Sequence, residues 1–76
     1  MNKVRRKELQ EVIEQINIAK ELLENIMCDE EEYRDNMPEN LQSSEKYEKA
    51  DAACDAMQEA INELEEAVSY IETAQE

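Results

Sequence analysis

Apolar residues recur along this chain at alternating steps of three and four residues, over two long stretches. Such spacing keeps one face of an α-helix towards one partner, and its average of about 3.5 residues is the coiled-coil period. In the first stretch only Glu30 interrupts the stripe, which contains Leu9, Val12, Ile16, Ala19, Leu23, Ile26, Tyr33 and Met37. In the second stretch the stripe is unbroken and contains Tyr47, Ala50, Cys54, Met57, Ile61, Leu64, Val68 and Ile71. The pattern predicts two long helices that pack along these stripes.

A short polar segment separates the two stretches and predicts a turn. Pro38 disfavours helical geometry in the residue before it, so the first helix should end before Met37. Ser43 or Ser44 can cap the second helix. Because the chain has no glycine, one of the loop's asparagines is expected to take the left-handed conformation. A short loop between helices of similar length indicates an antiparallel hairpin.

The predicted fold is therefore all-α, a single coiled-coil-like hairpin of two antiparallel helices over residues 1–76. The first helix spans about residues 2–35, the loop residues 36–43 and the second helix about residues 44–74. The expected register joins stripe residues of the two helices in the pairs Leu9–Ile71, Ile16–Leu64, Leu23–Met57, Ile26–Cys54 and Tyr33–Tyr47. Alanines at steps of seven flank the second stripe and favour close helix approach: Ala53, Ala60, Ala67 and Ala74.

Further apolar residues of the first helix lie off its stripe, and 76 residues is close to the lower limit for a self-sufficient core. Burial against a second copy would add apolar contact area. We therefore predict self-association into a homodimeric four-helix bundle, through Ile13, Ile18, Leu22 and Met27.

The composition argues against catalytic and metal-binding chemistry. The chain has no His, which is the usual general base and transition-metal ligand, and no Gly for a phosphate-binding loop. The two cysteines, Cys28 and Cys54, fall on different faces of the predicted hairpin, and no nucleophile is paired with a base. We expect no enzyme, no catalytic residue, no cofactor and no metal site. A calcium-binding acidic protein stays an alternative, although the EF-hand pattern with its central Gly is absent.

The chain is strongly acidic, with 21 Asp and Glu against 8 Lys and Arg and a net charge of −13. The distribution is uneven, because the first seven residues carry four bases and no acid. A large negative charge repels nucleic acids and anionic membranes and favours a basic protein surface as partner. The apolar runs are far shorter than a membrane span, and no signal-peptide core follows the basic start. A cytoplasmic protein is expected.

The acidic residues are spaced so that they form rows along the predicted helices. Carboxylates three or four residues apart on a helix have β-carbons about 5–6 Å apart, comparable to the phosphates of a nucleic-acid strand. The hypothesis is a nucleic-acid mimic that contacts a basic partner through Asp29, Glu31, Glu32, Asp35, Glu48, Asp51, Asp55, Glu59, Glu63 and Glu66. Two alternatives stay open: an acidic surface that is only solvated, and a structural or adaptor module that binds through an apolar helix face.

The loop segment Asp35-Asn36-Met37-Pro38-Glu39-Asn40-Leu41-Gln42 is distinctive, and a Ser-x-x-Tyr stretch at Ser44 to Tyr47 follows it. This segment resembles the loop of short acidic helical-hairpin proteins encoded by phages and mobile elements of Gram-positive bacteria. The resemblance implies a helical hairpin that works inside a bacterial host cell. Small acidic proteins from that setting are often similar to inhibitors of host nucleases, including anti-restriction and anti-CRISPR proteins. The leading hypothesis is therefore an inhibitor of a host nucleic-acid-binding protein.

Overall fold

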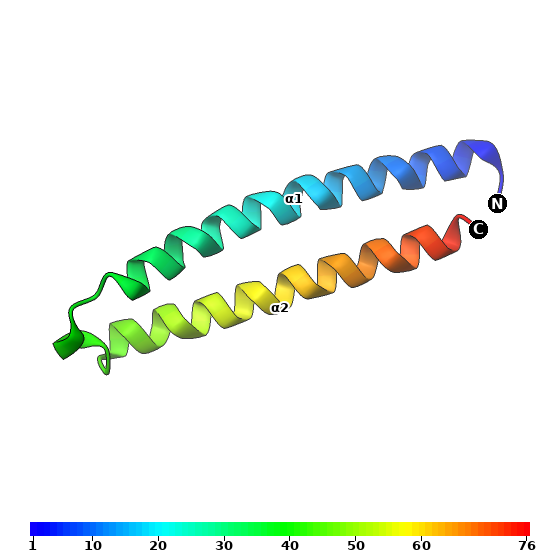
Figure 1. Cartoon of the computed structure of the whole chain (residues 1–76). Coiled ribbons are helices and arrows are strands. Elements are labelled where there is room, and N and C mark those ends of the chain that lie inside the picture. The colour runs from blue at the N-terminus through cyan, green and yellow to red at the C-terminus, as the bar shows by residue number, and fades with distance from the viewer.

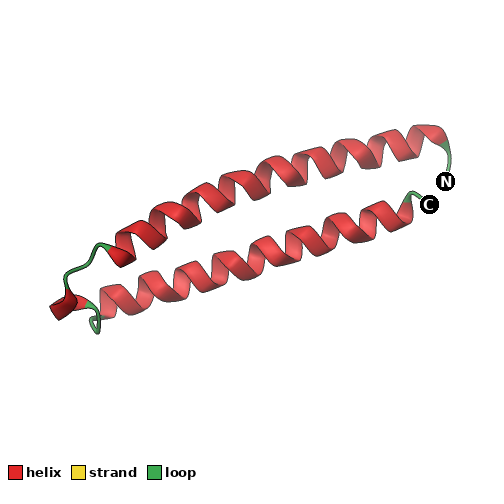
Figure 2. Ribbon diagram, in the orientation of Figure 1, coloured by secondary structure: helices red, strands yellow, loops and turns green.

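The computed structural model describes all 76 residues and contains two long helices joined by a short turn, with no strand (Figure 2). The elements are α1 (Lys3–Asp35), the 3-10 turn η1 (Glu39–Leu41) and α2 (Glu45–Ala74). The helices run antiparallel side by side, and both termini lie at the end opposite the loop (Figure 1). The Cα atoms span 59 × 15 × 12 Å, so the molecule is a thin rod. The predicted two-helix hairpin is confirmed.

Helix α1 begins and ends where local side-chain chemistry allows it. The Asn2 side chain caps its start, because Oδ1 accepts a hydrogen bond from the Arg5 backbone N–H at 2.8 Å. The helix ends at Asp35, three residues before Pro38. Its C-cap is Asn36, whose N–H donates to the Glu32 carbonyl at 3.0 Å. The end predicted from the proline is therefore confirmed.

The loop reverses the chain without a left-handed residue. The expectation that a loop asparagine would take that conformation was wrong, because no residue of the chain has a positive φ. Instead, η1 turns the backbone by a short 3-10 step. The Leu41 N–H donates to the Pro38 carbonyl at 2.8 Å, and the Gln42 N–H donates to the Glu39 carbonyl at 3.2 Å. These right-handed turns need no glycine, which explains how a glycine-free loop closes the hairpin.

Helix α2 starts at a conventional N-cap. Ser44, one of the two predicted serines, accepts a hydrogen bond at Oγ from the Tyr47 N–H at 3.3 Å. Glu45 and Glu48 lie in the first turn, where their negative charges interact favourably with the positive end of the helix dipole. These interactions fix the residue at which α2 leaves the loop.

The face of α2 that packs on α1 is the predicted one. Three of its stripe residues are buried, namely Ala50, Cys54 and Ile61, and the other five are half-buried. Ile61 is the most buried residue of the protein, with 2% of its surface exposed. Three of the flanking alanines are half-buried as well, whereas Ala74 at the helix end is exposed.

The face of α1 that packs on α2 is rotated from the prediction. The positions common to the predicted and observed faces are half-buried: Leu9, Ile16, Leu23, Glu30 and Met37. The remaining predicted positions are exposed, which makes that half of the stripe wrong: Val12, Ala19, Ile26 and Tyr33. Ile26 and Tyr33 are therefore not buried against α2, as the expected pairs with Cys54 and Tyr47 would require.

The residue after each of these exposed positions packs on α2 in its place. Ile13 is buried, and the other three are half-buried: Lys20, Met27 and Arg34. The observed frame keeps the same alternation of steps of three and four, so the period of the prediction was right and its phase was wrong. Two of the new positions carry long cationic side chains, whose aliphatic stems can cover apolar surface while their ends reach carboxylates.

Two ion pairs cross between the helices and show how they are aligned. Lys20 Nζ lies 3.8 Å from Glu65 Oε1, and Arg34 Nη1 lies 2.9 Å from Asp51 Oδ1. Both pairs join residues that are five or six positions, about one and a half helical turns, away from the predicted register. Side chains lean towards the N-terminus of their own helix, so in an antiparallel pair long side chains join residues offset in this sense.

Candidate functional site

The hairpin has two long sides of different chemistry. One, the ion-paired side, is marked by the contacts of Lys20 with Glu65 and of Arg34 with Asp51. The other, the apolar side, lies across the seam between the helices. Tyr33, the residue before Arg34, lines a groove there together with Lys46 of α2. The α1 residues that immediately precede Lys20 and Arg34 therefore lie on the apolar side. Each side therefore offers a different surface to a partner.

Arg34 holds the loop end of the ion-paired side together. Its Nε donates to Asp35 Oδ1 at 2.9 Å, and its Nη1 donates to Asp51 Oδ1 at 2.9 Å. The side chain is only 19% exposed. The hydrogen bond to Asp35 is the largest cause that raises the Arg34 pKa above its ordinary value, and Asp51 acts in the same sense. Arg34 therefore stays charged and occupies two carboxylates that were predicted to contact a partner.

The structure divides the predicted acidic contacts into engaged and free residues. Asp35 and Asp51 form ion pairs with Arg34, and Glu31 is half-buried, so these three carboxylates are less available to a partner. The other seven are exposed and form no ion pair within the chain: Asp29, Glu32, Glu48, Asp55, Glu59, Glu63 and Glu66. Five of the seven lie on α2. We call Glu48, Asp55, Glu59, Glu63 and Glu66 the α2 acidic row.

The α2 acidic row is a rigid array of free carboxylates. Its members lie within one continuous helix, Glu45–Ala74, whose opposite face packs on α1. From the first to the last member the helix rises about 27 Å, at about 1.5 Å per residue. Free carboxylates at these positions form a surface that attracts cations. The row can bind cationic side chains without rearranging the fold.

The apolar side carries the four residues that the predicted stripe wrongly buried, together with Leu22. We call Val12, Ala19, Leu22, Ile26 and Tyr33 the α1 apolar stripe. All five are exposed. Ile26 is 57% and Tyr33 51% exposed, although such residues are usually covered. Its members follow one another at steps of seven, three, four and seven residues, which keeps them on one side of α1 as a second helical partner would require.

The residues predicted for self-association separate into two pairs. Ile13 is 5% exposed and packs inside the hairpin, and Met27 is half-buried in the seam. These two predictions were wrong, because the rotated α1 face uses both residues within the chain. Ile18 and Leu22 are 61% and 59% exposed and remain available for another molecule.

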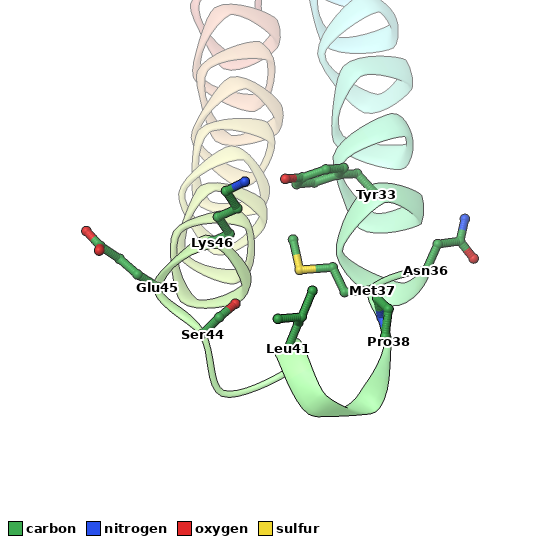
Figure 3. A pocket seen from close by; sticks show the side chains of 8 residues that line it. All are labelled: Tyr33, Asn36, Met37, Pro38, Leu41, Ser44, Glu45 and Lys46. Atoms are coloured by element: carbon green, nitrogen blue, oxygen red, sulfur yellow. The ribbon is translucent and has the colours of Figure 1, made fainter.

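A groove opens at the loop end of the apolar side. It encloses about 720 Å³ and is lined by Tyr33, Asn36, Met37, Pro38, Leu41, Ser44, Glu45 and Lys46. The Tyr33 and Lys46 side chains point towards one another across it, while Met37 and Leu41 point into it (Figure 3). Its interior is therefore apolar and its rim is polar. We call it the tip groove.

The two cysteines lie in contrasting surroundings. Cys54 is buried in the seam, and Cys28 is exposed on α1, so no disulfide joins them. Burial raises the pKa of the Cys54 thiol, and Glu31, Glu30 and Asp51 act in the same direction, whereas Arg34 lowers it. Cys54 is therefore held as a neutral thiol and behaves as a small core residue.

The sequence interpretation missed the roles of Lys20 and Arg34. A signal for them exists, because they recur at steps of seven with Ile13 and Met27. A frame through these four residues has the same period as the predicted stripe. That frame contains two charged residues, Lys20 and Arg34, so a count of apolar positions favours the predicted one.

Comparison with known proteins adds no relative. No protein-family model, no curated protein and no solved structure matches this chain. The structure itself contains no cluster of three or more His, Cys, Asp or Glu residues arranged to hold a metal ion. Neither helix has a stretch long and apolar enough to cross a bilayer.

Proposed function

We propose that this chain is a small acidic protein of a phage or mobile element that inhibits a nucleic-acid-binding protein of its bacterial host. The α2 acidic row binds the basic surface on which that protein otherwise holds phosphates. The observation that carries the proposal is that all five carboxylates of the row are exposed and free of ion pairs on one rigid helix. The phage setting rests on the resemblance of the loop segment, and an anti-restriction or anti-CRISPR role is its most specific form.

The dimensions of the row suit a phosphate-binding surface. A length of about 27 Å corresponds to about eight nucleotides of one strand, at about 3.4 Å per nucleotide. The rod is narrow, with Cα extents of 15 and 12 Å across its axis. A basic groove that accepts a nucleic-acid strand could therefore accept α2 with its row directed inwards.

Electrostatics favours such an encounter. The net charge of −13 attracts a basic surface from a distance and speeds association, and salt screens this attraction. The ion-paired carboxylates of Asp35 and Asp51 contribute less, because Arg34 already neutralises part of their charge. The proposal therefore assigns the binding to α2 rather than to the acidic residues around the loop.

The test is capture of partners from a lysate of Gram-positive bacteria, with elution by a salt gradient. The row variant carries Glu59→Gln, Glu63→Gln and Glu66→Gln. Its matched control carries three exposed α1 substitutions, Glu11→Gln, Glu14→Gln and Glu21→Gln, which remove the same charge. The proposal predicts that the wild type and the control capture a nucleic-acid-binding protein that elutes at moderate salt. The row variant should bind it at least about tenfold more weakly, since three charge-assisted contacts are lost.

A functional readout completes the test. The purified captured protein should lose its DNA or RNA when the wild-type chain is added, and keep it when the row variant is added. Equal capture by the row variant and the control would contradict the assignment to α2. Retention of the partner through about 1 M salt would contradict the electrostatic mechanism, because at that ionic strength charges are screened beyond about 3 Å.

A further inference from the structure

The hairpin exposes more surface than a compact protein of its mass. Its accessible area is 5829 Å², whereas a compact monomer of 8.9 kDa is expected to expose about 4,800 Å². The excess is about 1,000 Å². A stable protein interface takes about 800 Å² from each partner. Only four residues are buried within the chain. The hairpin therefore has enough uncovered area for one more partner and would gain apolar burial from it.

The uncovered apolar area is concentrated on one helix. The α1 apolar stripe runs over two-thirds of α1 on the side away from both ion pairs. Three half-buried alanines of α2 lie beside it and leave room for another helix: Ala53, Ala60 and Ala67. Such an apolar strip with polar edges has the form of a helix-packing interface.

We propose that a second copy of this chain covers the α1 apolar stripe, packed antiparallel about a twofold axis near Leu22. The stripe is nearly symmetric about that residue. In this arrangement Val12 of one copy lies near Tyr33 of the other, and Ala19 lies near Ile26. A small or medium side chain therefore meets a larger one at each level, which is how facing layers interdigitate. The contact is isologous and closes on itself as a dimer.

The charges at the two ends of the rod favour the antiparallel orientation. Four bases lie at the start of α1, and none forms an ion pair within its own chain: Lys3, Arg5, Arg6 and Lys7. Exposed acids gather at the opposite end of the rod: Glu32, Asp35, Glu39 and Glu45. An antiparallel dimer brings the bases of one copy to the acids of the other. A parallel dimer would place bases on bases and acids on acids, which costs association energy.

The tip groove fits the same arrangement. It lies on the apolar side at the loop end, next to Tyr33. The exposed apolar residues Met1 and Val4 lie at the other end of the rod. Antiparallel packing carries them along the second copy to the region of Met37 and Leu41, the apolar lining of the groove. One contact therefore covers both the stripe and the groove.

The dimer does not depend on the proposed function. The ion-paired side and the outer face of α2 remain uncovered in it, so the α2 acidic row stays accessible on both copies. The outcome of the partner capture and the outcome of the dimer test are separate. A substitution in the stripe changes the mass of the assembly and leaves every carboxylate of the row in place.

Disulfide formation between engineered cysteines tests the orientation. The background carries Cys28→Ser and Cys54→Ala, so that no native thiol interferes. Single variants V12C and Y33C are oxidised alone and as an equal mixture. The antiparallel dimer predicts rapid cross-linking of the mixture between V12C and Y33C chains, and little cross-linking of either alone. The control is E21C, an exposed position away from the stripe, which should cross-link at least about tenfold more slowly than the mixture.

Molar mass provides the second readout. At about 500 µM the wild type should have twice the monomer mass of 8.9 kDa, by mass action. The variant L22E/I26E should stay monomeric, with a dissociation constant raised at least about 100-fold, while circular dichroism shows unchanged helix content. Rapid cross-linking of V12C with itself would overturn the antiparallel orientation. A monomeric wild type at that concentration would overturn the dimer and assign the stripe to a different protein.

Discussion

The two helices of this hairpin have similar length and make opposite use of their apolar residues. Helix α2 directs its complete apolar stripe at α1, and Tyr70 is its one exposed large apolar residue. Between its two ends, helix α1 exposes five large apolar residues: Val12, Ile18, Leu22, Ile26 and Tyr33. One helix therefore has a single partner, whereas the other has apolar surface for two. The difference supports the proposal that α1 is the helix through which two copies assemble, with α2 presenting the acidic face.

Shortening one isoleucine on each helix tests the difference between the helices most strongly. Ile61→Ala removes the most buried side chain of α2 and should cost about 2–4 kcal/mol of unfolding free energy, through lost burial and the cavity that remains. Ile18→Ala shortens an exposed side chain of α1 and should change the stability by less than about 0.5 kcal/mol. Thermal unfolding followed by circular dichroism at low protein concentration measures both.

Equal effects of these two substitutions would contradict the asymmetry. If Ile18→Ala were the more costly change in dilute solution, α1 would have to be rotated so that Ile18 packs on α2.

A smaller effect is expected at Arg34, which ties α1 to α2. Arg34→Met keeps an apolar stem over the seam and removes the charge, whereas Arg34→Ala removes both. We expect the melting temperature to fall in the order wild type, Arg34→Met, Arg34→Ala, because the stem covers apolar surface and the charge binds Asp35 and Asp51. The charge contribution should shrink at high salt. Melting temperatures that are the same for all three proteins would show that the pair contributes nothing.

The smallest expected effect is a dependence of stability on alkaline pH through Cys54. Burial raises the pKa of this thiol in the folded chain, while the unfolded thiol ionises near its ordinary value of about 8.5. The stability contribution is therefore complete below about pH 8.5 and is lost as the pH rises towards the folded pKa. Urea unfolding at pH 7 and at alkaline pH should show a loss for the wild type. Cys54→Ala should reduce that loss, and Cys28→Ser should not.

Much of the fold was predictable from the sequence, and α2 shows why. All of its large apolar residues except Tyr70 lie in one stripe, and the other positions carry charged or polar residues or alanine, so only one phase of the helix can face a partner. The boundaries were also predictable, because Pro38 ends α1 and Ser44 caps α2. These signals are local, and each depends on few neighbouring residues.

The phase of α1 was not predictable by counting apolar positions. Its apolar residues support two frames, one through Val12 and Ile26 and the other through Ile13 and Met27. Counting favours the first frame, because the second contains Lys20 and Arg34. The structure has the second frame because those cations meet Glu65 and Asp51 across the seam. That choice depends on α2, which the sequence of α1 alone does not contain.

Part of the candidate site was predictable from the sequence as well. Exposure of the acids on the outer face of α2 follows from its unambiguous stripe, and the structure has all five members of the α2 acidic row exposed. The sequence could not show that Arg34 engages Asp35 and Asp51, because that contact depends on the phase of α1.

The most direct test of the account compares two adjacent residues of α1. Single variants V12C and I13C are made in the Cys28→Ser, Cys54→Ala background, and the alkylation rate of each thiol is measured against protein concentration. The account predicts slow alkylation of I13C at every concentration, because position 13 is buried within the hairpin. The V12C thiol should react rapidly in dilute solution and more slowly as the second copy covers it. Rapid alkylation of I13C together with protection of V12C in dilute solution would contradict the account.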